Sequence, residues 1–325
     1  MSDRPQHQRV QHIVSFSGGK DSGACIELAL MRGAPFRAIM CDTGNESQIT
    51  LDHAAAVSRR LEREIGRPLE IIRADFSEQI ARKRQVIQTK WRAEGVAEGV
   101  IERALTVLTP TGNPFLDLCI WKGRFPSRMA QFCTEELKAN VAWRQVIQPA
   151  LYNGPVVQWL GVRRDESAAR SGAPMIQAVR TPGLHKLTMY RPIIHWTAQN
   201  VISFAKARGA PINPLYRMGM SRVGCFPCIH SNKNELANLD ARFPDAIARI
   251  EEWEAVVAMV SKRQSATFFA PGKTPLNSAN GQKYLGVRDV VGWARSGKGG
   301  RQRDFLRELE LDEPSLCSSQ YGLCE

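Results

Sequence analysis

The sequence has no long apolar segment and no secretory leader. No apolar run approaches the roughly 20 residues that a membrane-spanning helix needs. Residues 1–9 are polar or charged and lack the apolar core of a signal peptide. We therefore expect a cytoplasmic protein with no membrane partner. In that reducing compartment, the eight cysteines are expected to be core residues, metal ligands or reactive thiols rather than disulfides.

Acidic residues are also scarce relative to basic ones. The chain of 325 residues carries 32 Asp and Glu against 44 Lys and Arg, a formal net charge of +12. This excess suggests a polyanionic partner, for which nucleic acid is the obvious candidate, although charge alone shows only non-specific attraction. The hydrophobic content of 43% is enough for a substantial core.

A third absence is the Walker A spacing, Gly-x-x-x-x-Gly-Lys-Ser/Thr. Instead, the apolar run 12–16 leads into a turn with two adjacent glycines, and a helix-like periodic segment follows at 23–30. Glycines let consecutive N–H groups point into a concavity, and the helix N-terminus adds about half a positive charge. Lys20 can add a full charge. The turn is therefore predicted to bind phosphate, with these candidate residues: Ser15, Ser17, Gly18, Gly19, Lys20, Asp21 and Ser22.

Strand-like and helical segments alternate along the first two thirds of the chain. The strands are expected at 12–16, 36–42, 69–75, 156–162 and 189–196, and the helices at 23–30, 51–65 and 198–208. This alternation predicts an α/β fold with a doubly wound parallel sheet. We place the α/β domain, including a cysteine cluster, at residues 10–230. Residues 231–325 are expected to form a mostly helical C-terminal extension with a cysteine-containing tail.

Polar groups follow two of the expected strands, where ligands bind in open parallel sheets. The first group comprises Asp42, Thr43, Gly44 and Glu46, and the second comprises Gly161, Arg163, Glu166, Ser167 and Arg170. Arginines at a strand end can clamp a phosphate with two hydrogen bonds. Both groups are predicted to bind a nucleotide, with an ordinary strand-to-helix turn or a charged surface loop as the alternative.

The cysteines form a constellation of their own. The C-x-x-C of Cys225 and Cys228 lies in a loop with Gly and Pro, so both sulfurs can converge on one metal. Cys133 is expected at a helix entrance capped by Thr134, where a thiolate is stabilised. With Cys317 or Cys324 near the chain end, three or four thiolates can converge on iron–sulfur or zinc. The remaining cysteines are expected to be packed (Cys25 and Cys41) or are ambiguous (Cys119).

The turn Ser17-Gly18-Gly19-Lys20-Asp21-Ser22 resembles the PP-loop of the ATP pyrophosphatases, which hold ATP and release pyrophosphate as an adenylate forms. The groups at 42–46 and 161–170 resemble, in order, the motifs of the phosphoadenosine-phosphosulfate reductase branch of that superfamily. The resemblance covers most of residues 12–230. It implies an adenine nucleotide alpha hydrolase-like fold.

The same resemblance implies a [4Fe-4S] cluster beside the PP-loop, with zinc as the alternative. Cys133, Cys225 and Cys228 match cysteines of the family, and we assign the fourth ligand to Cys317. The sequence departs from the assimilatory reductases in carrying a single cysteine, not an adjacent pair, at position 133. Cys324 then resembles their C-terminal catalytic thiol.

These expectations describe an ATP-dependent sulfur-transfer enzyme using ATP and Mg²⁺. A substrate oxygen attacks the α-phosphate, pyrophosphate leaves beside the loop amides, and sulfur from a cysteine desulfurase or sulfide displaces AMP. Catalytic roles are assigned to Lys20, Asp21 and Cys324. The intact PP-loop, which reductases usually carry in degenerate form, and the basic charge favour this function, with nucleic acid as candidate acceptor.

Two alternatives remain for the function. The first is a sulfonucleotide reductase, in which a C-terminal cysteine thiolate attacks the sulfur of an already activated sulfate. The second is a non-catalytic regulator that binds a nucleotide or a cluster. Outside the core, the glycine-loosened basic run 296–303 is either a nucleic-acid contact or an exposed loop.

Overall fold

The computed structural model describes residues 9–168, 170–269 and 286–296. Cys317, Cys324 and nearly all of the basic run 296–303 lie outside these residues, and the predictions made for them stay predictions. None of the helices described has the length and apolar content to span a bilayer.

A six-stranded sheet forms the centre of the α/β part, in the order β3-β2-β1-β4-β6-β5. Its strands are β1 (Gln11–Phe16), β2 (Phe36–Asp42), β3 (Glu70–Arg73), β4 (Val156–Trp159), β5 (Ile176–Val179) and β6 (Leu187–Tyr190). All neighbouring pairs are parallel except β5 with β6, which is antiparallel. The predicted α/β fold is confirmed. The edge strand β5 was not predicted, because its largely exposed residues carry little of the apolar pattern that marks a strand.

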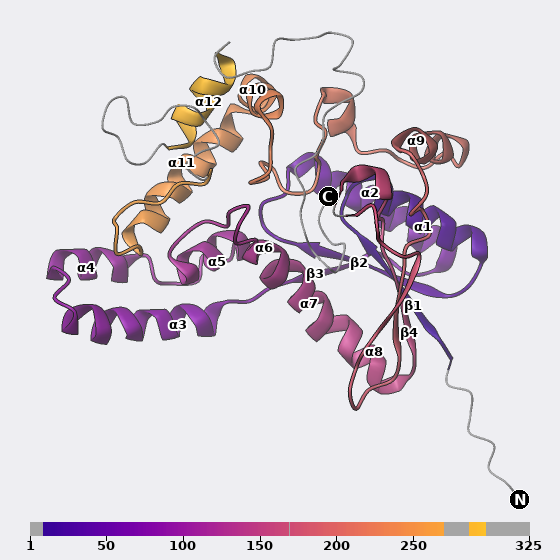
Figure 1. Ribbon diagram of the computed structural model, residues 1–325, viewed down its shortest axis with the longest axis horizontal. Helices are drawn as coiled ribbons and strands as arrows, with labels where there is room; N and C mark the ends of the chain where they lie inside the picture. Colours follow the sequence, from indigo (N-terminus) through magenta and orange to yellow (C-terminus); the bar gives the residue numbers. More distant parts are fainter. Residues whose placement is uncertain (1–8, 169, 270–285, 297–325) are drawn as a thin grey trace, which may run out of the picture.

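One face of the sheet is covered by α1 (Lys20–Arg32), α2 (Gln48–Ile65) and α9 (Ala198–Ala207) (Figure 1). Side chains alternate along β1, so Val14 and Phe16 pack under these helices while Ile13 packs on the opposite face. The helix ends follow local signals. Gly66 closes α2 in the left-handed conformation, and the side chain of Thr197 caps α9.

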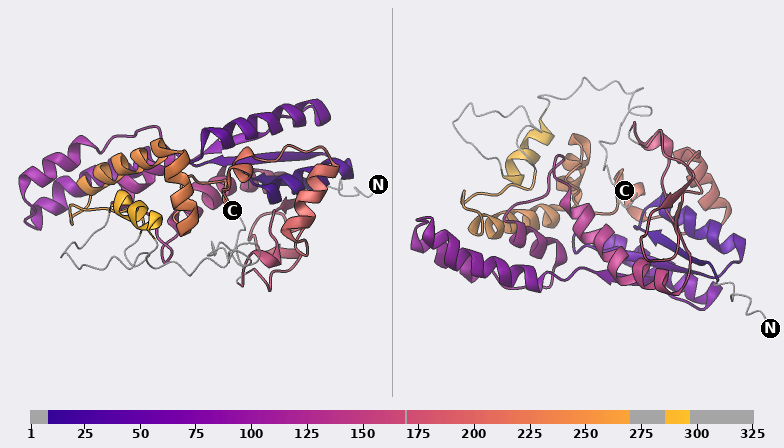
Figure 2. Two further views of the ribbon diagram at one scale, coloured as in Figure 1. Left: turned by 90° about the horizontal axis from the view of Figure 1, so that it is seen from above. Right: turned by 60° about the horizontal axis from the view of Figure 1, so that its bottom comes forward.

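The opposite face is covered by one continuous helical stretch, residues 132–153 (Figure 2). It consists of α6 (Phe132–Thr134), a π-turn η2 (Glu135–Ala139), α7 (Asn140–Ala142), a second π-turn η3 (Trp143–Ile147) and α8 (Gln148–Asn153). Helices on both faces make the sheet doubly wound, as predicted. The predicted cap at Thr134 is wrong: the helix begins earlier, at Phe132, whose buried ring anchors the first turn in the core.

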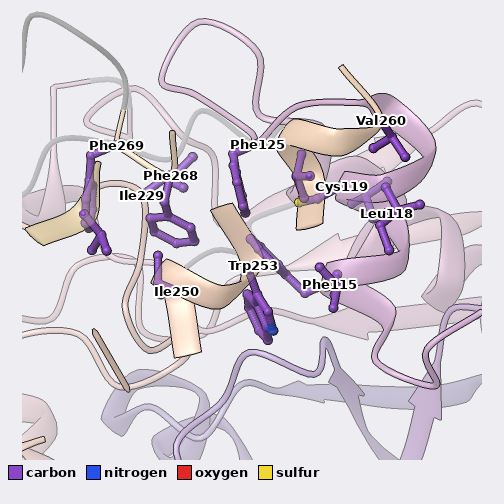
Figure 3. Packing of buried hydrophobic residues seen from close by; sticks show 14 of the residues in the cluster. Phe115, Leu118, Cys119, Phe125, Ile229, Ile250, Trp253, Val260, Phe268 and Phe269 are labelled. Carbon is purple, nitrogen blue, oxygen red and sulfur yellow. The ribbon is translucent and has the colours of Figure 1, made fainter. Parts of the chain in front are cut away.

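A second apolar core lies beside the sheet and is built by two segments far apart in the sequence. The first segment supplies α3 (Ser77–Val86), the π-turn η1 (Ile87–Trp91), α4 (Glu98–Thr106) and α5 (Pro114–Lys122), and the second supplies α10 (Lys233–Arg242), α11 (Pro244–Met259) and α12 (Val287–Arg295). We call these helices the helical lobe, and the sheet with its covering helices the sheet half. In the lobe, the ring of Phe115 on α5 stacks on the ring of Trp253 on α11, with 5.5 Å between the ring centroids. The ring of Phe268 also packs against Phe115 (Figure 3). The described helices after residue 230 therefore share their core with residues 76–137.

Candidate active site

The turn after β1 forms a cradle of backbone groups at the N-terminus of α1. Gly18 adopts φ +84°, and a Cβ there would lie 2.5 Å from the Thr50 side chain, so only glycine fits. Gly19 precedes the helix and supplies no side-chain cap, so the positive end of the helix dipole faces the turn. The hydroxyl of Ser22 donates to the carbonyl of Gly19 at 3.0 Å and accepts from the Ser17 N–H at 3.1 Å. The predicted phosphate cradle is thus shaped by its own serines.

The charge of Lys20 is held beside this cradle. Its ammonium lies 3.0 Å from the carboxylate of Asp21, which is almost completely buried. The other Asp21 oxygen accepts from Arg163 Nε at 2.6 Å. The backbone N–H of Lys20 donates to the hydroxyl of Tyr216 at 3.1 Å, and the ammonium lies 5.3 Å from that ring. Asp21 therefore positions Lys20.

The residues after β4 brace the loop from the other side. A Cβ on Gly161 would lie 2.6 Å from the backbone nitrogen of Ser22, so this glycine permits the close approach of β4 to α1. Besides Asp21, the buried guanidinium of Arg163 pairs with Asp165 and lies 3.8 Å from Glu166. The same Glu166 pairs with Arg170, while Ser167 lies partly buried beyond it. In this structure Arg163 is engaged by carboxylates, and the predicted clamp on phosphate would require it to exchange partners.

The turn after β2 joins the nucleotide side to the cysteine loop. Glu46 accepts from the Thr43 hydroxyl at 2.6 Å and from the Thr43 N–H, and the Gly44 N–H donates to Asp42 at 2.9 Å. Burial raises the pKa of Glu46 to about 7, and the nearby Asp42 carboxylate adds to this effect. These four predicted residues lie in one turn, which Arg73 and Asn113 also hold through hydrogen bonds to Asp42 and Gly44.

Asn45, for which the sequence predicted no role, forms the contact between this turn and the C-x-x-C loop. Its side-chain amide donates to the carbonyl of Pro227 at 2.9 Å, and its own carbonyl accepts from the Phe226 N–H at 2.6 Å. Asn45 is completely buried. No local signal marks this role, because both contacts join positions about 180 residues apart in the chain.

Three predicted metal ligands lie in the same region of the structure without forming a metal site among the described residues. Cys133, Cys225 and Cys228 interact electrostatically with one another and with Lys138, another residue that the sequence reading missed. Burial lowers the pKa of Lys138, but Cys225 and Glu46 beside it raise the pKa overall. A cation is therefore enclosed among three thiols and a carboxyl group.

Burial opposes the thiolate expected at Cys133. Burial, with a contribution from Cys228, raises the pKa of Cys133 to about 11, and burial also raises the pKa of Cys225 to about 12. The loss of water around the sulfur outweighs the helix N-terminus and Lys138.

The donor set suits an iron–sulfur cluster, because soft thiolates are its preferred ligands. Its arrangement is open, however: within the ranges described, no three His, Cys, Asp or Glu side chains are placed to hold a metal ion. Binding a cluster would require the two cysteine segments to close together. A further described thiol, Cys119, interacts with Cys133 from the buried side of α5.

A small pocket of about 30 Å³ lies between the cradle and Lys138, although Cys133, Cys225 and Cys228 do not line it. Ser15, Ser17, Ser22 and Gly161 line its nucleotide side, and Cys41, Glu46, Lys138 and Gly224 line its cysteine side. The sequence analysis expected Cys41 only to pack in the core, but Cys41 also lines this pocket.

The family is established by comparison with known proteins. Residues 11–231 match the model of the phosphoadenosine phosphosulfate reductase domain. The chain belongs to the phosphoadenosine phosphosulfate reductase family, as the motifs predicted.

Individual relatives extend this comparison. An uncharacterized 37.8 kDa protein of Escherichia phage 186 is 42% identical over 97% of this chain and 96% of its own length. An adenosine 5′-phosphosulfate reductase of Neisseria meningitidis is 38% identical, but over only 22% of this chain and 28% of its own length. A crystal structure of phosphoadenylyl-sulfate reductase from Candida auris aligns with 67% of this chain and 82% of its own at a TM-score of 0.39 and 14% identity.

Proposed function

We propose that the protein is an ATP-dependent sulfur-transfer enzyme that releases pyrophosphate, with a nucleic acid as acceptor. The observation that carries this proposal is a pocket lined on one side by Ser17 and Ser22 of the PP-loop and on the other by Lys138, which interacts electrostatically with the three thiols. Activation of the acceptor and delivery of sulfur can then occur near each other.

At the nucleotide end, the amides of Gly18 and Gly19 receive the phosphates as they receive any anion at a helix N-terminus. Lys20 leaves its contact with Asp21 and binds the pyrophosphate leaving group, whose developing charge it stabilises. Asp21 and Arg163 keep the start of α1 in place meanwhile. Bound Mg²⁺ would neutralise further phosphate charge.

At the thiol end, Cys133, Cys225 and Cys228 would hold a [4Fe-4S] cluster, with the fourth position taken by Cys317, as assigned from the sequence, or by Cys324 or Cys119. If none of these cysteines binds, three protein ligands would leave one iron open to sulfide for transfer. Lys138 balances the negative charge of the thiolates.

Replacing the loop lysine tests the nucleotide end. Lys20→Ala should weaken ATP binding by about 10- to 150-fold, since a charge-assisted hydrogen bond contributes about 1.5–3 kcal/mol. Isothermal calorimetry measures this directly, and pyrophosphate release should be lost wherever the wild type shows it. Lys206→Ala, an exposed lysine on α9, is the matched control and should bind ATP normally. Equal ATP affinity of Lys20→Ala and the wild type would contradict the proposal.

Cysteine substitutions test the thiol end. After anaerobic purification, Cys133→Ser, Cys225→Ser and Cys228→Ser should each lose the iron and the visible absorption of the wild type. Cys25→Ala, which replaces a buried cysteine of α1, should keep both. The same measurement on Cys119→Ser, Cys317→Ser and Cys324→Ser identifies the fourth ligand. Full iron content in Cys225→Ser would refute the cluster and leave zinc or a thiol pair.

A sulfonucleotide reductase is the second candidate, because an adenosine 5′-phosphosulfate reductase matches part of this chain at 38% identity. Calorimetry separates the two candidates. A clear preference for ATP over adenosine 5′-phosphosulfate and phosphoadenosine phosphosulfate supports sulfur transfer. Tighter binding of either sulfonucleotide would reverse the order.

A further inference from the structure

A roomy groove lies next to the phosphate cradle and is not used by the chemistry described above. Its volume is about 520 Å³, and one wall is the short helix η5 (Pro214–Met218) while the other is α10. The lining residues are Arg217, Met218, Gly219, Asn234, Ala237, Asn238 and Arg242. Two guanidinium groups and two amides therefore face one open space, and no acidic side chain is among the residues that line it.

Hydrogen bonds hold the two walls of the groove together and orient its side chains. The side-chain amide of Asn238 donates to the carbonyl of Met218 at 2.8 Å and so joins the two walls. The Asn238 oxygen accepts from Arg242 Nε at 2.9 Å, which orients that guanidinium while its terminal nitrogens make no hydrogen bond among the described residues. Arg217 is exposed on η5.

Nearby carboxylates are engaged elsewhere. Glu235 on α10 is buried, where it accepts from the Ser221 hydroxyl and from the Arg222 N–H. Asp240 pairs with Arg295 of α12. The positive charge of Arg217 and Arg242 is therefore not cancelled by these two acids.

The groove is also close to the reaction site. Tyr216 and Arg217 are consecutive residues of η5, and the Tyr216 hydroxyl holds the Lys20 N–H of the PP-loop at 3.1 Å. The short helix η5 therefore contributes both to a wall of the groove and to the support of the phosphate cradle.

We propose that this groove binds the phosphate backbone of the nucleic-acid acceptor, with Arg217 and Arg242 on its phosphates and Asn234 and Asn238 available to sugar or base edges. Paired guanidinium and amide groups are the common donors to nucleic acids. The net charge of +12 favours a polyanion over a neutral partner. The inference rests on the proposed function in taking the acceptor to be a nucleic acid.

The test compares the full chain with two double variants of equal charge. Arg217→Gln/Arg242→Gln removes the groove cations, and Arg59→Gln/Arg63→Gln removes two exposed arginines of α2 as control. Binding to labelled single-stranded DNA, duplex DNA and single-stranded RNA is measured by fluorescence anisotropy from about 50 to about 200 mM salt. Thermal unfolding of all three proteins verifies their folding.

The groove variant should bind its best nucleic acid about tenfold more weakly than the wild type, and its slope of log affinity against log salt should fall by between about 1 and 2. The control should lose much less. Equal losses in both double variants, or no binding of any of the three nucleic acids by the wild type, would overturn the proposal. ATP calorimetry on the same preparations tests the proposed function separately. If the wild type binds nucleic acid but not ATP, the proposed ATP-dependent function is refuted and the groove proposal is not.

Discussion

The sheet half and the helical lobe bury similar side chains but are assembled in different ways. In the sheet half, β1 and β2 are each followed within a few residues by a covering helix, α1 and α2. In the lobe, α11 packs on α4 and α5, which lie more than 100 residues earlier in the chain. The first arrangement leaves local signals in the sequence, whereas the second does not.

The two regions contribute different parts of the candidate site. The phosphate cradle belongs to the sheet half and depends on local glycines and serines. The thiol site lies where the two regions meet: Cys133 and Cys228 pack against the core of the lobe, while Glu46 and the pocket belong to the sheet edge. We therefore expect damage to the lobe to affect the thiols before it affects the phosphate loop.

The largest effect is expected from truncating a tryptophan in each region. Trp253→Ala in the lobe and Trp159→Ala on β4 should each cost about 3–5 kcal/mol of unfolding free energy, since both rings are buried. Only Trp159→Ala should weaken ATP binding, because β4 leads directly into Gly161. Urea unfolding and ATP calorimetry measure the two quantities. An equal loss of ATP affinity in both variants would show that ATP binding depends on the lobe as much as on the sheet half.

A smaller effect is expected from Gly161→Ala, which tests the local design of the sheet half. The added methyl group would lie 2.6 Å from the Ser22 nitrogen and must push α1 away from β4. Such overpacking costs about 1–3 kcal/mol, and ATP binding should be lost with it. Gly23→Ala is the matched control, because its Cβ meets nothing within 4 Å and a helical alanine adds about 0.5–1 kcal/mol of stability. Normal ATP affinity in Gly161→Ala would show that the approach of β4 is not critical.

The smallest effect is expected from Glu254→Gln in the lobe. Its carboxylate accepts from the Phe268 and Val287 N–H groups at 2.7 and 2.9 Å and so joins two segments. The glutamine amide has only one acceptor oxygen, but the substitution also removes a buried charge. The free energy of unfolding should therefore fall by only about 1 kcal/mol. Glu251→Gln, which removes an exposed ion pair with Arg288, should change stability less.

The pH dependence of this variant provides a second measurement. Burial raises the pKa of Glu254 above its ordinary 4.5, so the folded protein binds this proton more tightly than the unfolded chain does. The resulting stability is fully present below pH 4.5 and is lost as the pH rises through the folded-state pKa. The Gln variant should lack this component. An unchanged pH profile of unfolding free energy would contradict the assignment.

Much of the sheet half could be predicted from the sequence. The bounds of β2, the stop of α2 at Gly66 and the cap of α9 at Thr197 all follow from side chains within a few residues. The edge strand β5 escaped prediction because its exposed residues need no apolar pattern, and the start of the helix at Phe132 depends on burial in a distant core.

The sequence by itself determined the phosphate cradle and the order of the motifs, because a glycine turn and a helix N-terminus are local consequences of the backbone. Only the tertiary structure decided which residues surround the thiols. Asn45 and Lys138 reach the cysteine loop across long stretches of chain, and Tyr216 reaches the PP-loop in the same way. The pKa of Cys133 shows the reason: a helix start favours a thiolate locally, but burial by distant segments removes the water that a charge needs, and burial prevails.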